Sequence, residues 1–181
     1  MSKSSKKREI KLQTKPNRWS CVAVSFAMAI NRSFDEFVEE VGHDGSEVIW
    51  PWLPEPMCRR GFHIQECIRV AMRHDFTVTP VELIPAIAPS SLPPTPSSED
   101  TIPYPVLYGP TLNTNFCYFD QHVLYGRGVI TGVGRQCLHA VAFDHGTIYD
   151  PEGITYSYSQ EHCLEMGFIT QCLWLVNDNN S

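Results

Sequence analysis

A ten-residue run from Cys21 to Ile30, CVAVSFAMAI, constrains the fold of this chain more than any other stretch. It is apolar except for one serine, and its apolar residues surround a helix axis instead of forming one stripe. A helix of that kind is stable only when neighbouring elements cover it on all sides. At ten residues the run is also too short to cross a bilayer, which takes about 20 residues. The sequence therefore predicts a helix over 21–31 at the centre of a folded domain.

Length and charge bound the organisation of the chain. With 181 residues, 43% of them hydrophobic, it can bury one good core, so we expect a single domain over 19–181. Seven of the fourteen basic residues fall within 1–18, which predicts a flexible basic arm. From residue 19 onward seven arginines face nineteen carboxylates, a net charge of −12 that repels nucleic acid. We therefore expect no nucleic-acid partner.

The cysteines and the N-terminus indicate the compartment. No apolar segment of the signal-peptide type follows the basic N-terminus, and the seven cysteines are scattered without the spacing of a disulfide framework. No CxxC or HxxxH occurs, so no metal or other cofactor is expected. We predict a soluble, cytoplasmic protein without a membrane partner, and the oligomeric state stays open.

The order of the remaining patterns predicts the fold class. Ser33 and Glu36 form a capping box that opens a second helix, which Gly42 ends. A proline-rich loop over 43–61, a helix over 61–75 and a strand over 76–85 follow. Helices first and an antiparallel sheet afterwards make an α+β domain.

The second half of the chain reads mainly as strands. Residues 85–105 hold seven of the fourteen prolines and predict a long surface loop. Strand-like stretches then cover 106–109, 116–126, 138–144, 147–150 and 171–176, and a short helix is predicted over 159–167. The glycine-rich stretch 126–134 lacks the lysine and the following helix of a phosphate loop, and predicts a flexible hairpin.

A histidine and an aspartate flank the predicted hairpin LHAVAFDHGTIYDPEG. If His145 and Gly146 form a two-residue turn, His139 and Asp150 share one face of the sheet as diagonal neighbours, about 7 Å apart at the backbone. A three-residue loop would instead place Asp150 on the other face. Alternatively, His139 is an ordinary strand histidine and Asp150-Pro151 merely ends the strand.

Together with a cysteine at a helix start, these residues supply the groups of a cysteine nucleophile. A thiol at a helix N-terminus beside an imidazolium loses its proton more readily than a free thiol. Cys21 would attack a carbonyl carbon, His139 would protonate the leaving amine, and Asp150 would orient the imidazole. Cys137 is a weaker candidate because it lies on the strand of His139 without a helix dipole, and Ser25 lacks the G-x-S-x-G elbow of serine hydrolases.

The order of Cys21 on an N-terminal helix, His139-Ala140-Val141 on a strand and Tyr149-Asp150-Pro151 after a turn resembles the papain-like cysteine peptidases. It is most similar to the branch of bacteriocin-leader-processing (double-glycine) peptidases and related small bacterial and phage proteins. The resemblance implies a papain-like fold, with the nucleophile helix packed on a C-terminal antiparallel sheet. It also implies a cysteine peptidase or isopeptidase that acts on a peptide or protein through a thioester acyl-enzyme.

The resemblance assigns the oxyanion hole to Gln13 together with the Cys21 backbone N–H. That branch usually places the glutamine six positions before the cysteine, whereas Gln13 stands eight before it. Asn17 is the nearest substitute, and Gln13 can otherwise be a polar residue at the end of a flexible arm.

The tryptophans leave a further alternative open. Trp19, and Trp50 in the segment IWPWLP with Trp52, can line a substrate groove beside the nucleophile. Equally, the Trp50 and Trp52 rings can be hydrophobic anchors that pin a proline-rich loop.

Two classes of function therefore remain. An intact Cys-His-Asp set favours a thiol hydrolase, or the same triad used for deamidation or acyl transfer. The shifted glutamine favours a catalytically inactive scaffold that binds or inhibits a partner protein.

Overall fold

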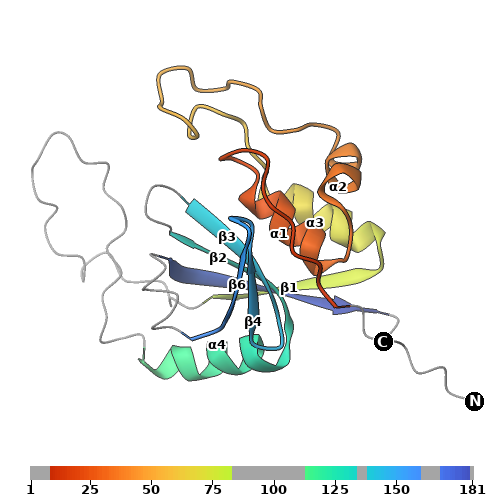
Figure 1. Ribbon diagram of the computed structural model, residues 1–181, viewed down its shortest axis with the longest axis vertical. Coiled ribbons are helices and arrows are strands. Elements are labelled where there is room, and N and C mark those ends of the chain that lie inside the picture. The colour runs from red at the N-terminus through yellow and green to blue at the C-terminus, as the bar shows by residue number, and fades with distance from the viewer. Residues whose placement is uncertain (1–8, 83–112, 134–137, 160–167, 180–181) are drawn as a thin grey trace, which may run out of the picture.

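One antiparallel sheet carries helices on both of its faces (Figure 1). The computed structural model describes residues 9–82, 113–133, 138–159 and 168–179. The helices described are α1 (Cys21–Ala29), α2 (Phe34–Val41), α3 (Ile64–Arg73) and α4 (Asn113–Tyr125). The strands described are β1 (Phe76–Glu82), β2 (Arg127–Val133), β3 (Leu138–Asp144), β4 (Thr147–Asp150), β5 (Ile154–Ser157) and β6 (Ile169–Asp178).

The sheet has the order β1-β6-β2-β3-β4-β5, and every neighbouring pair is antiparallel. The last strand, β6, lies between β1 and β2, so the C-terminal part of the chain is inserted between two earlier strands. The predicted α+β class is confirmed. The helix that begins at Cys21 packs on this sheet, as the papain-like resemblance implies.

Helix α1 is the centre of the core, as its all-round apolar sequence predicts. Eight of its nine residues are buried, and it packs against β3 and β2. Ala140 and Ala142 lie on the β3 face below it, and their small side chains let the helix approach the sheet closely. The N-terminal end of α1 is thereby fixed relative to the start of β3.

Helix α4 covers the opposite face of the sheet (Figure 1). The strand predicted over 116–126 is wrong, because residues 113–125 are helical. The prediction followed the aromatic and β-branched composition of the stretch. Phe119 and Val123 stand four residues apart and are both buried against Ile130 and Leu173, so burial of one helical face outweighs the strand propensity.

The glycine-rich stretch is also more regular than predicted. Its described residues from Arg127 to Val133 form β2, which pairs with β3 as one arm of an antiparallel hairpin that leads to His139, as predicted, and which also pairs with β6 on its other side. Gly128 explains the glycine content, because a Cβ at this position would overlap the carbonyl oxygen of Trp174 on β6. The strand needs glycine where two neighbouring backbones come close.

The helix boundaries follow the local signals. Ser33 and Glu36 form the predicted capping box, and Gly42 ends α2 with a φ of 88°. The helix predicted over 61–75 and the strand predicted over 76–85 appear as α3 and β1, and 43–61 has neither helix nor strand apart from one isolated bridge. The proline-rich loop over 85–105, the strand over 106–109 and nearly all of the helix over 159–167 lie outside the described residues.

The N-terminal segment is not a flexible arm where it is described. Residues 9–18 lie against the body: Ile10 is 4% exposed and packs with Val24, Met28 and Tyr149. The backbone N–H of Lys15 donates to the carbonyl of Pro151 at 2.8 Å. Buried apolar contacts and a backbone hydrogen bond therefore hold residues 9–18 in place, whereas the basic residues of this segment had indicated a solvated, flexible arm.

Replacement of Gly128 by alanine tests the close approach of β2 and β6. We expect Gly128→Ala to lower the free energy of unfolding by about 1–3 kcal/mol, because the methyl group forces two central strands apart. The measurement is urea unfolding, with Gln121→Ala on exposed α4 as a control that changes the stability by less than about 0.5 kcal/mol. Equal midpoints for both variants would show that the strands can separate without cost.

Candidate active site

The thiol of Cys21 lies at the first residue of α1. Its residue is 6% exposed, and the helix begins with the bond from the Val24 N–H to the Ser20 carbonyl at 2.9 Å. Ser20 is buried but does not cap the helix with its side chain, because its hydroxyl donates instead to the side-chain oxygen of Asn17. The first-turn N–H groups and the positive end of the helix dipole are thus left beside the sulfur.

The hairpin between β3 and β4 has the register that the sequence predicts. His145 and Gly146 form the two-residue turn with φ values of 49° and 79°, the left-handed conformations that a type I′ turn requires. Asp144 pairs with Thr147 and Ala142 with Tyr149, so His139 and Asp150 fall on the same face.

His139 and Asp150 are in direct contact. The His139 Nε2 lies 3.0 Å from Oδ1 and 3.2 Å from Oδ2 of Asp150. Both side chains are largely withdrawn from water, at 12% and 7% exposure. The backbone N–H of Glu152 also donates to Oδ1 at 2.9 Å, which fixes the carboxylate from its other side. Asp150 is also the last residue of β4, so the end of the strand and the contact with His139 coincide at this position.

The ring of Phe168 packs edge-on against the imidazole, with centroids 5.4 Å apart and an interplanar angle of 88°. Phe168 is 2% exposed and lies just before β6. It excludes water from one side of the His139–Asp150 contact and so strengthens that contact. Sequence patterns gave no signal for this residue, because it approaches His139 only through the crossover that brings β6 beside β2.

The Cys21 thiol meets the same imidazole at the start of β3. Its Sγ lies 3.9 Å from the carbonyl of Leu138, the residue that precedes His139 on β3. Burial lowers the pKa of His139, but the hydrogen bonds and charges of Asp150 and Cys21 outweigh burial and raise it to about 9. The protonated ring therefore stabilises the fold fully below a pH of about 6.5, its ordinary pKa, and this contribution is lost as the pH rises through about 9.

Two other side chains among the described residues, the Cys67 thiol and the Ser25 hydroxyl, lack such surroundings. Burial raises the pKa of the Cys67 thiol, and the nearby charges of Glu66 and Cys21 raise it further. The hydroxyl of Ser25 is buried and has no hydrogen-bond partner among the described residues, so no base activates it there. Cys137 lies outside the described residues.

Gln13 does not approach the thiol, which corrects the oxyanion role predicted for it. Its side-chain N–H donates to the Arg32 carbonyl at 2.7 Å, and its side-chain oxygen accepts from the Phe34 N–H at 2.8 Å. Both partners follow the C-terminal end of α1, whereas Cys21 stands at the N-terminal end. Both ends of the amide thus hold the connection between α1 and α2.

Asn17 lies next to the nucleophile. Its side-chain oxygen accepts from the Trp19 N–H at 3.2 Å and from the Ser20 hydroxyl. Among the described residues its amide nitrogen has no hydrogen-bond partner, and the residue is only partly buried. The carbonyl end of the side chain is thus fixed at the entry to α1, and its two N–H groups are left available.

The tryptophans divide into two environments. The Trp19 indole N–H donates to the Asp44 carbonyl at 3.1 Å, and the Arg59 guanidinium lies over its ring at 5.1 Å. Trp50 and Trp52 are 42% and 74% exposed. Trp19 therefore anchors the loop over 43–61, whereas the prediction of hydrophobic anchors at Trp50 and Trp52 is wrong for rings so exposed.

The part of the chain that the structure describes has neither a group of metal ligands nor a helix that could span a membrane. No three histidine, cysteine, aspartate or glutamate side chains are grouped there as metal ligands. Within the same residues, every helix is too short or too polar to cross a membrane.

Comparisons with known proteins do not assign a function to this chain, so the assignment depends on the geometry of the candidate site. No family model matches the sequence, and no curated protein shows significant similarity. Among solved structures, the chain is similar to a double glycine motif protease from an AMS/PCAT transporter, in complex with the leader peptide. The match covers 96% of both chains at 13% identity, with a TM-score of 0.47. At these values the similarity by itself assigns neither a fold family nor an activity to this chain.

Substitution of Gln13 tests its structural role. We expect Gln13→Ala to lower the free energy of unfolding by about 1 kcal/mol, because two hydrogen bonds that join α1 to α2 are lost. Gln13→Glu keeps the acceptor for the Phe34 N–H but not the donor to the Arg32 carbonyl, and should lose less. Urea unfolding measures both, and a Gln13→Ala chain as stable as the wild type would contradict this role.

Proposed function

We propose that the chain is a papain-like cysteine peptidase or isopeptidase. It hydrolyses an amide bond in a peptide or protein with Cys21 as nucleophile, His139 as general acid and base, and Asp150 as the residue that orients the imidazole. One observation carries the proposal: a buried imidazole contacts a carboxylate, and the thiol at the N-terminus of α1 lies 3.9 Å from the carbonyl of the residue before that histidine. Such a set is the usual arrangement of an activated cysteine nucleophile.

Acylation uses the two sides of the His139 ring. Asp150 occupies Nε2, which leaves Nδ1 to exchange a proton with the sulfur. The Cys21 thiolate attacks the carbonyl carbon of the substrate and forms a tetrahedral oxyanion. Its collapse breaks the carbon–nitrogen bond, the imidazolium gives its proton to the leaving amine, and the acyl group stays on the sulfur as a thioester.

Deacylation restores the enzyme. His139 takes a proton from a water molecule, whose oxygen attacks the thioester carbon. The sulfur leaves as thiolate, the product leaves as a carboxylic acid, and the imidazolium is regenerated. Throughout the cycle Asp150 holds the His139 ring in place, which matches the raised pKa of His139.

The oxyanion requires donors near the first turn of α1. The Cys21 backbone N–H is one, and the amide nitrogen of Asn17 is the second that we propose. Its side-chain oxygen is fixed by two donors, so the amide plane is held before the substrate arrives. A preorganised donor of this kind contributes about 3 kcal/mol to the transition state.

A non-catalytic alternative rests on a specific observation. The glutamine that the resembling peptidases use for the oxyanion is engaged elsewhere in this chain. A scaffold that lacks this donor can bind or inhibit a protein, and the same triad can also serve deamidation or acyl transfer.

The pH dependence of Cys21 alkylation by iodoacetamide separates these functions. We expect rapid labelling already below pH 7, because the His139 ring beside the sulfur is protonated there. In His139→Ala the rate should instead rise only near pH about 8.5, as for a free thiol. Peptide mapping by mass spectrometry assigns the label to Cys21.

Cys67 serves as the internal control, because its burial keeps it unlabelled at every pH where the chain is folded. Asp150→Asn should lie between the wild type and His139→Ala. A wild-type rate that already follows a free thiol, and that does not respond to His139, would exclude the catalytic proposal.

Asn17→Asp tests the second oxyanion donor. The substituted carboxylate still accepts from the Trp19 N–H and the Ser20 hydroxyl but donates nothing, so we expect kcat on a cleaved peptide to fall by about 100-fold. Asn17→Ser, which has no charge, separates the loss of the donor from the added charge. Both variants should retain iodoacetamide labelling of Cys21, and an unchanged kcat would remove Asn17 from the site.

A further inference from the structure

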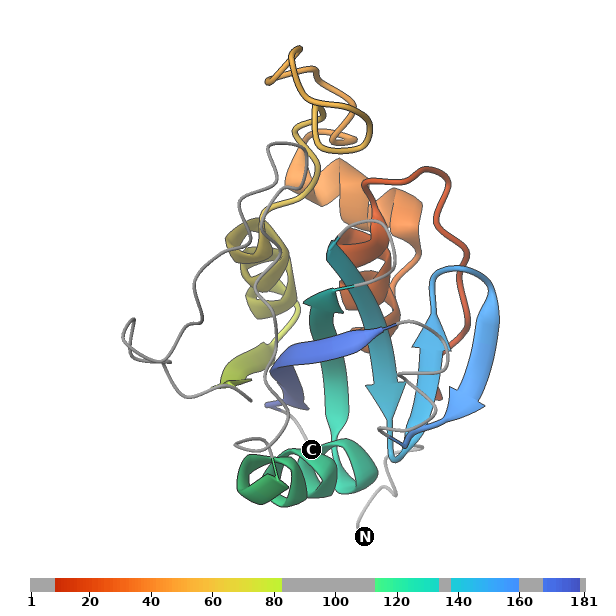
Figure 2. The ribbon, with the colours of Figure 1, turned by 90° about the vertical axis from the view of Figure 1, so that its left-hand side faces the viewer.

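The loop over 43–61, here called the tryptophan loop, carries an apolar surface that the triad does not use. It extends from the end of the molecule at which α1 begins (Figures 1 and 2). Four neighbouring large side chains on it are exposed: Val48 by 49%, Ile49 by 41%, Trp50 by 42% and Trp52 by 74%. Single exposed apolar residues are ordinary, but a cluster on one loop is typical of a binding surface.

Backbone hydrogen bonds fix the shape of the tryptophan loop. Its two arms are joined by bonds from Arg60 N–H to the Glu47 carbonyl at 2.7 Å and from Gly61 N–H to the Gly45 carbonyl at 3.0 Å. The Ile49 N–H donates to the Cys58 carbonyl at 2.9 Å nearer the tip. A Cβ at Gly45 would lie 2.8 Å from the Gly61 carbonyl oxygen, so the arms touch.

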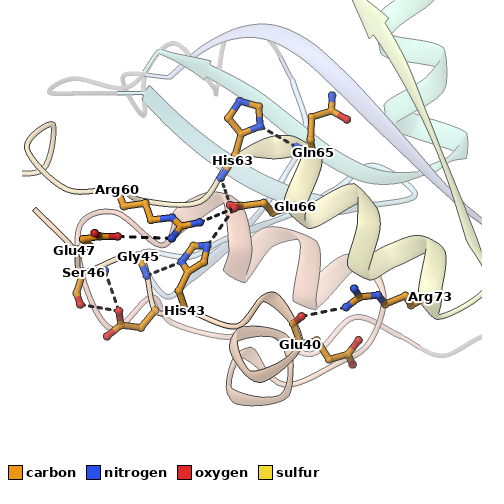
Figure 3. A network of polar contacts seen from close by, with 11 residues as sticks. Glu40, His43, Gly45, Ser46, Glu47, Arg60, His63, Gln65, Glu66 and Arg73 are labelled. Atoms are coloured by element: carbon orange, nitrogen blue, oxygen red, sulfur yellow. Dashed lines mark hydrogen bonds and ion pairs between the residues drawn. The ribbon is translucent and has the colours of Figure 1, made fainter. Parts of the chain in front are cut away.

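An ionic network fixes the base of the loop (Figure 3). Glu66 on α3 lies at its centre, with Arg60 at 3.1 Å and the His43 ring at 3.3 Å. Arg60 also reaches Glu47 at 3.7 Å, and the Gly45 N–H donates to the other nitrogen of His43 at 3.1 Å. The loop is therefore a defined platform mounted on α3.

Trp19 connects this platform to the candidate active site. It stands two residues before Cys21 and bonds the Asp44 carbonyl, while Arg59 lies over its ring. Arg59 is held in turn by Ser46 and Glu55, at 2.7 and 2.8 Å. A chain bound at Cys21 can therefore continue onto the exposed tip of the loop.

The charges indicate what such a chain carries. Glu47 and Glu55 lie on either side of the apolar tip in sequence, and their side chains are 68% and 45% exposed although each pairs with an arginine of the loop. The loop as a whole has three carboxylates against two arginines, a net charge of −1. The Asp44 carboxylate adds a third negative group, and the body as a whole has a large excess of acidic residues. This surface attracts basic side chains and repels an anionic membrane.

We propose that the tryptophan loop is a recognition surface for the polypeptide substrate of Cys21, and that it binds an apolar segment of the substrate flanked by basic residues. The inference rests on the proposed peptidase function. It adds a substrate class: polypeptides long enough to reach the loop, in contrast to short peptides that contact only the triad.

Cleavage of a proteome-derived peptide mixture tests the proposal. We expect peptides cut by the wild type to be enriched in apolar segments next to lysine or arginine, at a fixed distance from the cut. Trp50→Ser/Trp52→Ser should lose this enrichment and cut long peptides at least tenfold more slowly, yet keep the preference for residues at the cut itself. An unchanged cleavage pattern and rate would overturn the proposal.

Tyr125→Ser is the matched control, because Tyr125 is an aromatic residue with 78% exposure at the end of α4. It removes an exposed ring from a different part of the surface and should leave cleavage unchanged. Thermal unfolding confirms that all variants are folded. A Tyr125→Ser chain as impaired as the double variant would indicate a general effect of surface apolar area and overturn the proposal.

A binding measurement keeps the test independent of catalysis. Cys21→Ala is titrated with a synthetic peptide that carries a Leu-Phe-Ile-Leu segment between lysine pairs, and with the same peptide carrying glutamate pairs. The lysine peptide should bind at least tenfold more tightly, and Trp50→Ser/Trp52→Ser in this background should remove the difference. Equal binding of both peptides would overturn the recognition surface, whereas absence of Cys21-dependent cleavage alone would overturn only the peptidase function.

Two other occupants are decided by direct measurements. Sedimentation of phosphatidylcholine vesicles with the wild type but not the double variant would identify a lipid surface as the partner. Concentration-dependent dimerisation that the double variant lacks would identify a second copy of the chain. Either result would overturn the proposal.

Discussion

The hydrogen bond between His139 and Asp150 depends on one two-residue turn, and much of the molecule depends on the same turn. His145 and Gly146 fix the register of β3 and β4, and that register alone decides which side chains share a face. It directs His139 toward Asp150 and, on the other face of β3, presents the alanines on which α1 packs. This turn therefore determines both the contact between His139 and Asp150 and the distance between α1 and the sheet.

The features predicted correctly from sequence were those with local causes. An all-round apolar run can only be buried, a capping box satisfies its own helix end, and a His-Gly turn fixes a hairpin register. Errors arose where distant parts of the chain decide the outcome. Burial against the sheet made 113–125 a helix despite its strand-forming residues, and Gln13 bonds the end of α1 instead of its start. Phe168 meets His139 only because β6 crosses to the middle of the sheet.

The polar groups around the candidate site are arranged by supports of very different strength. The His139–Asp150 pair is buried, and its geometry is enforced by the strands and by Phe168. The contacts that mount the tryptophan loop on α3 are more exposed and individually weak, but they share Glu66 and act together. A rigid chemical centre beside a platform held by several modest contacts is suited to admitting long chains while keeping the reacting groups in place.

Residues 9–20, which lead to α1, connect two parts of the candidate site. The hydrogen bond from Lys15 to Pro151 joins the segment before Cys21 to the residue just after Asp150, although these positions lie far apart in the sequence. Cys21 and Asp150 are thus both attached to the segment that contains Lys15. A displacement of this segment would move the Cys21 sulfur and the Asp150 carboxylate in the same direction. The distance between the two groups would therefore change less than the position of either.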